Sequence, residues 1–107
     1  MMRILIDECL NWRLSRAATG HYAVSTQKMG WAGLKNGALL IEAEKQFDVF
    51  VTGDLNLNFQ QDVTKYNIAV IVLHAESTQL HHTLPLMPKV LTLIPTLKPG
   101  QVVDVYP

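Results

Sequence analysis

Short apolar runs alternate with amphipathic stretches along the whole chain. The apolar runs are bounded by polar or turn-forming residues and fall at 4–6, 21–26, 48–52, 68–73 and 101–106. Runs of this length and composition predict β-strands, most of them buried on both faces. The segments between them carry apolar residues at helical spacing, which predicts helices over 11–20, 36–46 and 80–94 and a weak helix within 56–65.

This order of elements predicts the class of fold. Apolar strands that alternate with helices are typical of a parallel sheet covered on both faces. We therefore expect an α/β fold, namely a three-layer αβα sandwich around a mainly parallel five-stranded sheet, built as a single domain over residues 1–107. Pro85 and Pro88 interrupt the last helical stretch, so that stretch is predicted to be kinked or divided.

Acidic residues follow two of the predicted strands. Asp7 and Glu8 end the first strand, and Asp54 follows the third. In an open parallel sheet, ligands bind beyond the carboxyl ends of the strands where the strand order reverses. A 2-1-3-4-5 order makes the first and third strands neighbours, so these acids converge. Clustered carboxylates suit Mg²⁺ or Mn²⁺, and such an ion polarises a phosphoryl group and activates water. The structural alternative is that each Asp caps a helix or closes a turn.

Composition restricts the environment more than the chemistry. Nine Lys and Arg balance nine Asp and Glu, so no strongly basic surface for nucleic acid is indicated, although neutrality leaves room for a local basic edge. Cys9 is the single cysteine, which excludes an intramolecular disulfide. The apolar runs are too short for a signal peptide or a membrane span. We expect a cytoplasmic protein with no membrane partner.

Several stretches of the chain resemble a known family. They are Ile4–Leu10, Met29–Gly37, Asp48–Leu57, Gln60–Gln61, Ala69–Leu73 and Leu84–Pro88. In order and spacing they are similar to the short PIN-like proteins of bacteria, and the resemblance covers nearly the whole chain. It implies a metal-dependent endoribonuclease, in some members the toxin of a toxin–antitoxin pair. RNA is then the substrate, and a separate antitoxin protein binds over the acidic edge.

The resemblance also implies roles for individual residues. Asp7 and Asp54 match the metal-binding acids, Glu8 stands beside them as a further catalytic acid, and Thr52 matches the polar residue of a T-x-D signature. Where family members often carry more acids, this chain has Asn36, Ala38 and Asn56. A site with so few acids is expected to bind one Mg²⁺ or Mn²⁺ ion weakly.

The remaining candidates are residues that would contact the substrate. They are Asn36, Thr52, Asn56, Arg13 and Lys35, the last two as phosphate contacts. A solvated helix face or loop is the simpler explanation for the two cations.

Two other functions compete with the nuclease. The missing acids favour a catalytically reduced PIN-like interaction domain without nuclease activity, in which the apolar stretch 80–94 supplies a homodimer face. A receiver-type phosphoacceptor would need a Ser or Thr after the fourth strand, where this chain has Leu73 and His74.

Overall fold

The computed structural model describes residues 1–107 and is built around one five-stranded sheet. Its strands are β1 (Arg3–Ile6), β2 (Tyr22–Ser25), β3 (Val49–Thr52), β4 (Ala69–Leu73) and β5 (Val102–Val105). Every neighbouring pair is parallel and the spatial order is β2-β1-β3-β4-β5. This confirms the predicted fold class and strand order, and it makes β1 an interior strand.

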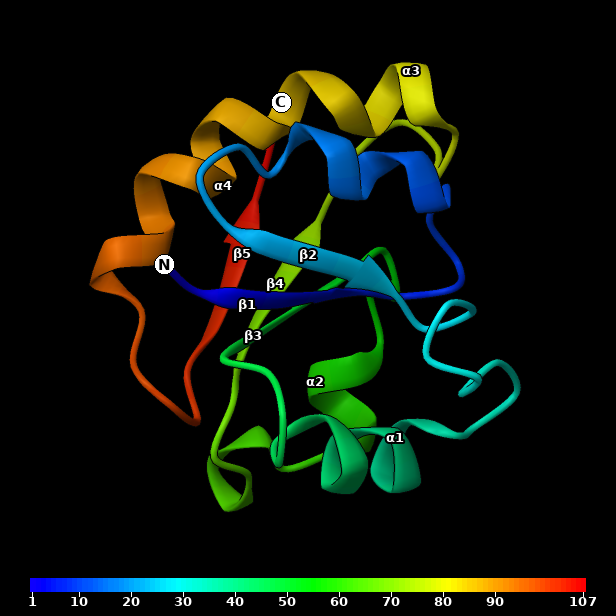
Figure 1. The fold of residues 1–107 in the computed structure, drawn as a ribbon, viewed down its shortest axis with the longest axis vertical. Coiled ribbons are helices and arrows are strands. Elements are labelled where there is room, and N and C mark those ends of the chain that lie inside the picture. Colours follow the sequence, from blue (N-terminus) through cyan, green and yellow to red (C-terminus); the bar gives the residue numbers. More distant parts are fainter.

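Helical segments cover both faces of the sheet (Figure 1). One face carries η1 (Trp12–Ala17), α3 (Leu80–Thr83), η3 (Leu84–Leu86), α4 (Met87–Leu93) and η4 (Ile94–Thr96). The other carries α1 (Asn36–Ala43), α2 (Leu57–Gln60) and η2 (Val63–Lys65). Ile4 and Ile6 pack into the first layer and Leu5 into the second, because successive side chains of a strand point to opposite faces. The three layers follow from this alternation.

All four helical regions differ from their predicted extent: α1 ends at Ala43 instead of residue 46, and the stretch predicted as one weak helix holds both α2 and η2. The segment predicted over 11–20 is a 3₁₀ helix that ends at Ala17, although Asn11 caps it as the pattern predicts by accepting the N–H of Arg13 at 2.9 Å. The stretch 80–94 is divided into the consecutive segments α3, η3 and α4, with η4 beginning at Ile94. Proline occupies the first or second position of η3, α4 and η4. Because proline donates no N–H, the helical hydrogen bonding restarts at each one.

The interior position of β1 determines where its carboxyl end lies. Ile6 is in register with Val51 of β3, and the N–H of Asp7 donates to the carbonyl of Val51 at 2.9 Å. The ladder thus continues one residue beyond β1 and fixes Asp7 beside the end of β3. None of the helices combines the length and apolar character that crossing a bilayer requires.

Candidate functional site

The hydroxyl of Thr52 joins the two aspartates that follow β1 and β3. It donates to Asp7 Oδ2 at 2.7 Å and accepts the backbone N–H of Asp54 at 3.0 Å. Thr52 is completely buried, so its rotamer is fixed by packing as well as by these bonds. The convergence expected from the strand order is therefore present, with Thr52 as the link between the two acids.

Asp7 is an almost fully buried acid. Its residue is only 7% exposed, and Oδ2 accepts a second hydrogen bond from Cys9 Sγ at 3.3 Å. Its other oxygen, Oδ1, accepts no hydrogen bond from the protein, yet it is not sealed from solvent, because the structure contains no fully buried side-chain oxygen without a partner. Asp7 thus offers one free carboxylate oxygen at the edge of the sheet.

Asp54 is half-buried, and both of its oxygens accept hydrogen bonds. Oδ2 accepts from Asn36 Nδ2 at 3.1 Å, and Oδ1 accepts the backbone N–H of Asn56 at 3.0 Å. The second bond closes a turn of the kind Asp favours ahead of a helix, and α2 follows it. Asn36, the first residue of α1, supplies a neutral donor at a position where an acid would repel Asp54. Asp54 therefore has a clear structural role in addition to its place beside Asp7.

The other candidate residues lie outside this cluster. Glu8 is exposed, and its Oε1 accepts the N–H of Gly33 at 3.0 Å, which ties it to the loop before α1. Asn56 reaches Asp54 only through its backbone. The guanidinium of Arg13 lies 4.6 Å from the ring centre of Trp12. Lys35 is exposed and forms no ion pair. The structure brings together Asp7, Thr52, Asp54 and Asn36.

Cys9 belongs to the cluster although it was not among the predicted site residues. Its thiol donates to Asp7 and accepts the N–H of Gly53 at 3.4 Å. Cys9 is exposed as a residue, but its sulfur is partly withdrawn from water, and this desolvation, reinforced by the negative charge of Asp7, raises the pKa of Cys9 to about 11. The thiol consequently stays protonated at neutral pH and remains a donor. The signal in the sequence was its position two residues after Asp7.

Gly53 allows the segment that carries Asp54 to lie close to the end of β1. A Cβ at this position would stand 3.0 Å from Cγ2 of Thr78 and 3.1 Å from Cδ2 of Leu10. Real side chains are rarely this close, so with a larger residue either these two methyl groups or the segment itself would have to shift by a few tenths of an ångström. The glycine between Thr52 and Asp54 is therefore part of what positions the cluster.

The donor set fits at most one weakly held divalent cation. No group of three or more Asp, Glu, His or Cys side chains is close enough to hold a metal ion. Mg²⁺, however, often binds through one or two carboxylates and keeps several waters. The free Oδ1 of Asp7 and the remaining lone pairs of Asp54 meet that minimum. Asp7 and Asp54 are the residues that would hold the ion.

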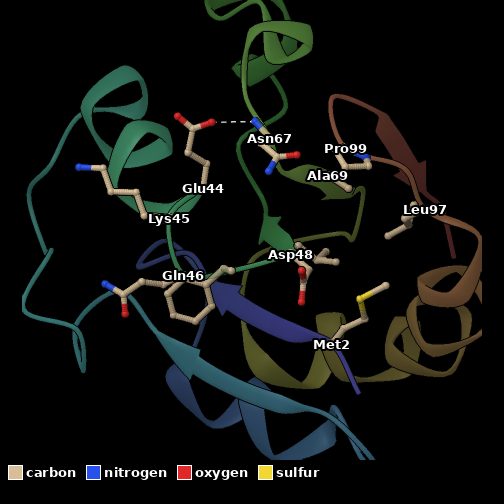
Figure 2. A pocket seen from close by; sticks show the side chains of 11 residues that line it. Met2, Glu44, Lys45, Gln46, Asp48, Asn67, Ala69, Leu97 and Pro99 are labelled. Carbon is tan, nitrogen blue, oxygen red and sulfur yellow. Dashed lines mark hydrogen bonds between the residues drawn. The ribbon is translucent and has the colours of Figure 1, made fainter.

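The hollows of the surface lie elsewhere. Neither Asp7 nor Asp54 lines any of the four hollows, so none of these hollows opens onto the acids. Figure 2 shows one hollow of about 350 Å³ at the amino ends of the strands, opposite the acids. The carboxylates that line it accept hydrogen bonds from the backbone: Glu44 accepts the N–H of Asn67 and Asp48 accepts that of Arg3, both at 2.8 Å. This hollow offers no catalytic group to the acidic edge.

Comparison with known proteins found no match: no family model fits the chain, and no curated protein or solved structure is significantly similar to it.

Proposed function

We propose that the chain is a PIN-like, metal-dependent endoribonuclease of low turnover, whose site is the edge formed by Asp7, Thr52 and Asp54. The observation that carries this proposal is the pair of carboxylates linked through one buried hydroxyl, with a free oxygen left on Asp7. Carboxylate pairs at the carboxyl ends of neighbouring parallel strands suit a hard cation and a phosphate-containing ligand. This edge of the sheet suits an extended substrate such as single-stranded RNA.

Each residue of the cluster has a separate task in this proposal. Thr52 and Cys9 orient the carboxylate of Asp7 through Oδ2, which leaves Oδ1 as the oxygen that would hold the ion. Asn36 donates one amide hydrogen to Asp54, and its second amide hydrogen remains for a phosphate oxygen. The ion, when bound, polarises the scissile phosphodiester and lowers the pKa of water.

Turnover is slow in this proposal because the chain supplies no third carboxylate. The carboxylate of Glu8 accepts the N–H of Gly33. Asn36 stands where a further acid would take a proton from the attacking water. General-base catalysis contributes roughly 10²–10⁴-fold, and that factor is missing here. Binding of an antitoxin over the acidic edge would cover the same residues.

The proposal is tested by incubating a fluorescently labelled single-stranded RNA with the protein in Mn²⁺ or in EDTA. We expect slow cleavage in Mn²⁺ only, and its loss in Asp7→Asn. Asp62→Asn is the matched control, because Asp62 is exposed and its carboxylate accepts the N–H of Thr64 at the start of η2 instead of bonding to a residue of the cluster. Circular dichroism verifies that each variant is folded. Cleavage that survives both EDTA and Asp7→Asn would refute the mechanism.

A second candidate is an interaction domain without nuclease activity. The observation that favours it is the hydrogen bond from Asn36 to Asp54, which lets a neutral amide take the place of a cation. In that case Mn²⁺ does not change the melting temperature and no RNA is cleaved at any protein concentration. A metal-dependent rise in melting temperature that Asp7→Asn abolishes would exclude this candidate.

A further inference from the structure

Basic residues are concentrated in the part of the chain that contains β2. Residues 9–41 include Arg13, Arg16, Lys28 and Lys35 but no Asp or Glu, in a chain whose cations and acids are equal in number. None of these cations forms an ion pair. The acidic side chains that hydrogen-bond to this stretch are Asp7 at Cys9, Glu8 at Gly33 and Asp54 at Asn36. Arg13, Arg16 and Lys28 have no acidic partner, so their positive charge attracts a negatively charged partner.

The outer edge of β2 has unpaired backbone groups. β2 is the last strand of the sheet and pairs only with β1. The N–H groups of Tyr22 and Thr26 donate to the carbonyls of Met2, just before β1, and of Ile6 in β1, at 3.1 and 2.9 Å. Since alternate residues of a strand bond to opposite sides, the N–H and C=O of Ala23 point away from the sheet.

This edge lacks the usual protection against strand addition. β2 reads Tyr-Ala-Val-Ser and contains neither a charged residue nor a proline, whereas β5 at the opposite edge carries Asp104. Charged side chains and prolines are common devices that keep edge strands from pairing with other chains. The carbonyl of Ser25 is occupied by the N–H of Met29, so the open part of the edge centres on Ala23.

A hollow of about 470 Å³ lies along the same edge. Its lining includes Trp12, Ala23, Ser25 and Lys28. Trp12 is 43% exposed, and the guanidinium groups of Arg13 and Arg16 lie 4.6 and 4.9 Å from its ring centre. The hollow therefore combines a free strand edge, an aromatic wall and cations. In Figure 1, η1 lies above β2, whose carboxyl end leads into the loop that contains Lys28.

We propose that the outer edge of β2 is a docking site for an acidic, extended peptide segment of a partner protein, which adds to the sheet as a strand. Such a segment supplies both a C=O and an N–H to Ala23, and its acidic side chains face the cations. A second copy of this chain would place like charges together. RNA carries donors in its 2′-hydroxyls and bases, but its backbone does not offer a C=O and an N–H at the spacing of a β-strand. The acidic peptide satisfies both the strand edge and the cations.

The probe is a fluorescein-labelled hexapeptide, Glu-Val-Glu-Val-Glu-Val, compared with its Lys-Val counterpart, with a version N-methylated on the valines, and with a single-stranded RNA. We expect fluorescence anisotropy to show salt-sensitive binding of the acidic peptide, at least about tenfold tighter than that of the N-methylated and Lys-Val versions. Amide hydrogen exchange is expected to slow at Ala23. Asp7→Asn should bind equally well, so that the result is independent of the proposed nuclease site.

Two variants test the contacts separately. Ala23→Pro removes an outward N–H without breaking a bond to β1, and Lys28→Glu reverses a charge that lines the hollow. Both should weaken peptide binding at least about tenfold, whereas Lys65→Glu, an equivalent change at an exposed position in η2, should not. If Ala23→Pro fails to fold, Lys28→Glu and the N-methylated peptide decide the outcome.

Three results would overturn the proposal. Equal binding of the acidic and N-methylated peptides would exclude strand addition. Binding of RNA in preference to every peptide would identify the basic region as a nucleic-acid surface. A dimer of the protein alone, disrupted by Ala23→Pro in analytical ultracentrifugation, would show that a second copy occupies the edge.

Discussion

Asn36→Asp is the substitution for which the structure gives the clearest energetic expectation. Asn36 Nδ2 donates to Asp54 Oδ2 at 3.1 Å, so an aspartate at position 36 replaces a donor by a second carboxylate oxygen. The variant loses a hydrogen bond to a charged group and gains a like-charge contact. In EDTA it should therefore be less stable than the parent, and the loss should come from the acidic edge alone.

The size of the effect follows from Coulomb's law. Two unit charges about 4 Å apart repel by about 1 kcal/mol in bulk water and about 4 kcal/mol at an effective dielectric constant of 20. Asn36 and Asp54 are both half-buried, so the repulsion lies between these limits after screening by solvent. The lost hydrogen bond adds about 1 kcal/mol. We expect the free energy of unfolding to fall by roughly 2–5 kcal/mol.

A divalent cation should reverse this loss. Asn36→Asp adds a third carboxylate next to Asp7 and Asp54, and an ion present at about a hundred times its dissociation constant stabilises a protein by about 2.7 kcal/mol. Thermal and urea melts of the parent and the variant, in EDTA and across a Mn²⁺ titration, measure both effects. The variant should bind Mn²⁺ more tightly than the parent and should cleave RNA faster.

Asn58→Asp is the matched control for this experiment. Asn58 is exposed in α2 and its side chain makes no hydrogen bond, so the same change of charge should alter stability by less than about 0.5 kcal/mol. If the Asn36→Asp protein melts like the parent in EDTA, the contact between residue 36 and Asp54 does not contribute to the free energy of unfolding. A variant that is destabilised but indifferent to Mn²⁺ would refute the metal site.

Two further predictions concern the neighbours of this contact. Asp54→Ala removes the acceptor of the Asn36 and Asn56 N–H groups, so in EDTA it should cost about 0.5–2 kcal/mol in a urea melt, and a gain in stability would contradict the turn-closing role. The pKa of Cys9 is about 11 in the folded protein, against an ordinary value of 9.0. The contribution of Cys9 to the free energy of unfolding is therefore highest below pH 9.0 and falls as pH rises toward 11. Iodoacetamide should accordingly modify Cys9 about 100-fold more slowly at pH 8 than a thiol with the ordinary pKa, and a rate that levels off near pH 9 would contradict the shift.

The fold could be predicted because its strands are apolar on both faces. Runs such as Val49–Thr52 and Ala69–Leu73 are fully buried and have no polar side to present to water, so they indicate interior strands of a covered sheet. The ends of the helices were harder to predict. The first helix was expected to reach Gly20 but ends at Ala17, because a six-residue 3₁₀ turn satisfies the same pattern of apolar residues as a longer helix.

The position of the site could be predicted, but its hydrogen bonding could not. Asp7 and Asp54 meet because strand ends in a parallel sheet share an edge, and that follows from topology alone. The direction in which Glu8 turns depends on the loop that carries Gly33, a contact between residues 25 positions apart. Similarly, Arg13 lies against its neighbour Trp12, a packing choice that spacing along the chain does not encode.

Cys9 and Asn36 have the same effect on the acidic edge. Each donates a hydrogen bond to a carboxylate, Cys9 to Asp7 and Asn36 to Asp54. The raised pKa of Cys9 keeps its hydrogen in place at neutral pH, and the amide of Asn36 never loses its own. The two acids are therefore hydrogen-bonded without a metal ion, and among their oxygens only Oδ1 of Asp7 accepts no hydrogen bond. In the proposed site an ion would compete with Asn36 for Asp54, which is why a change at position 36 should affect ion binding more strongly than one at position 58.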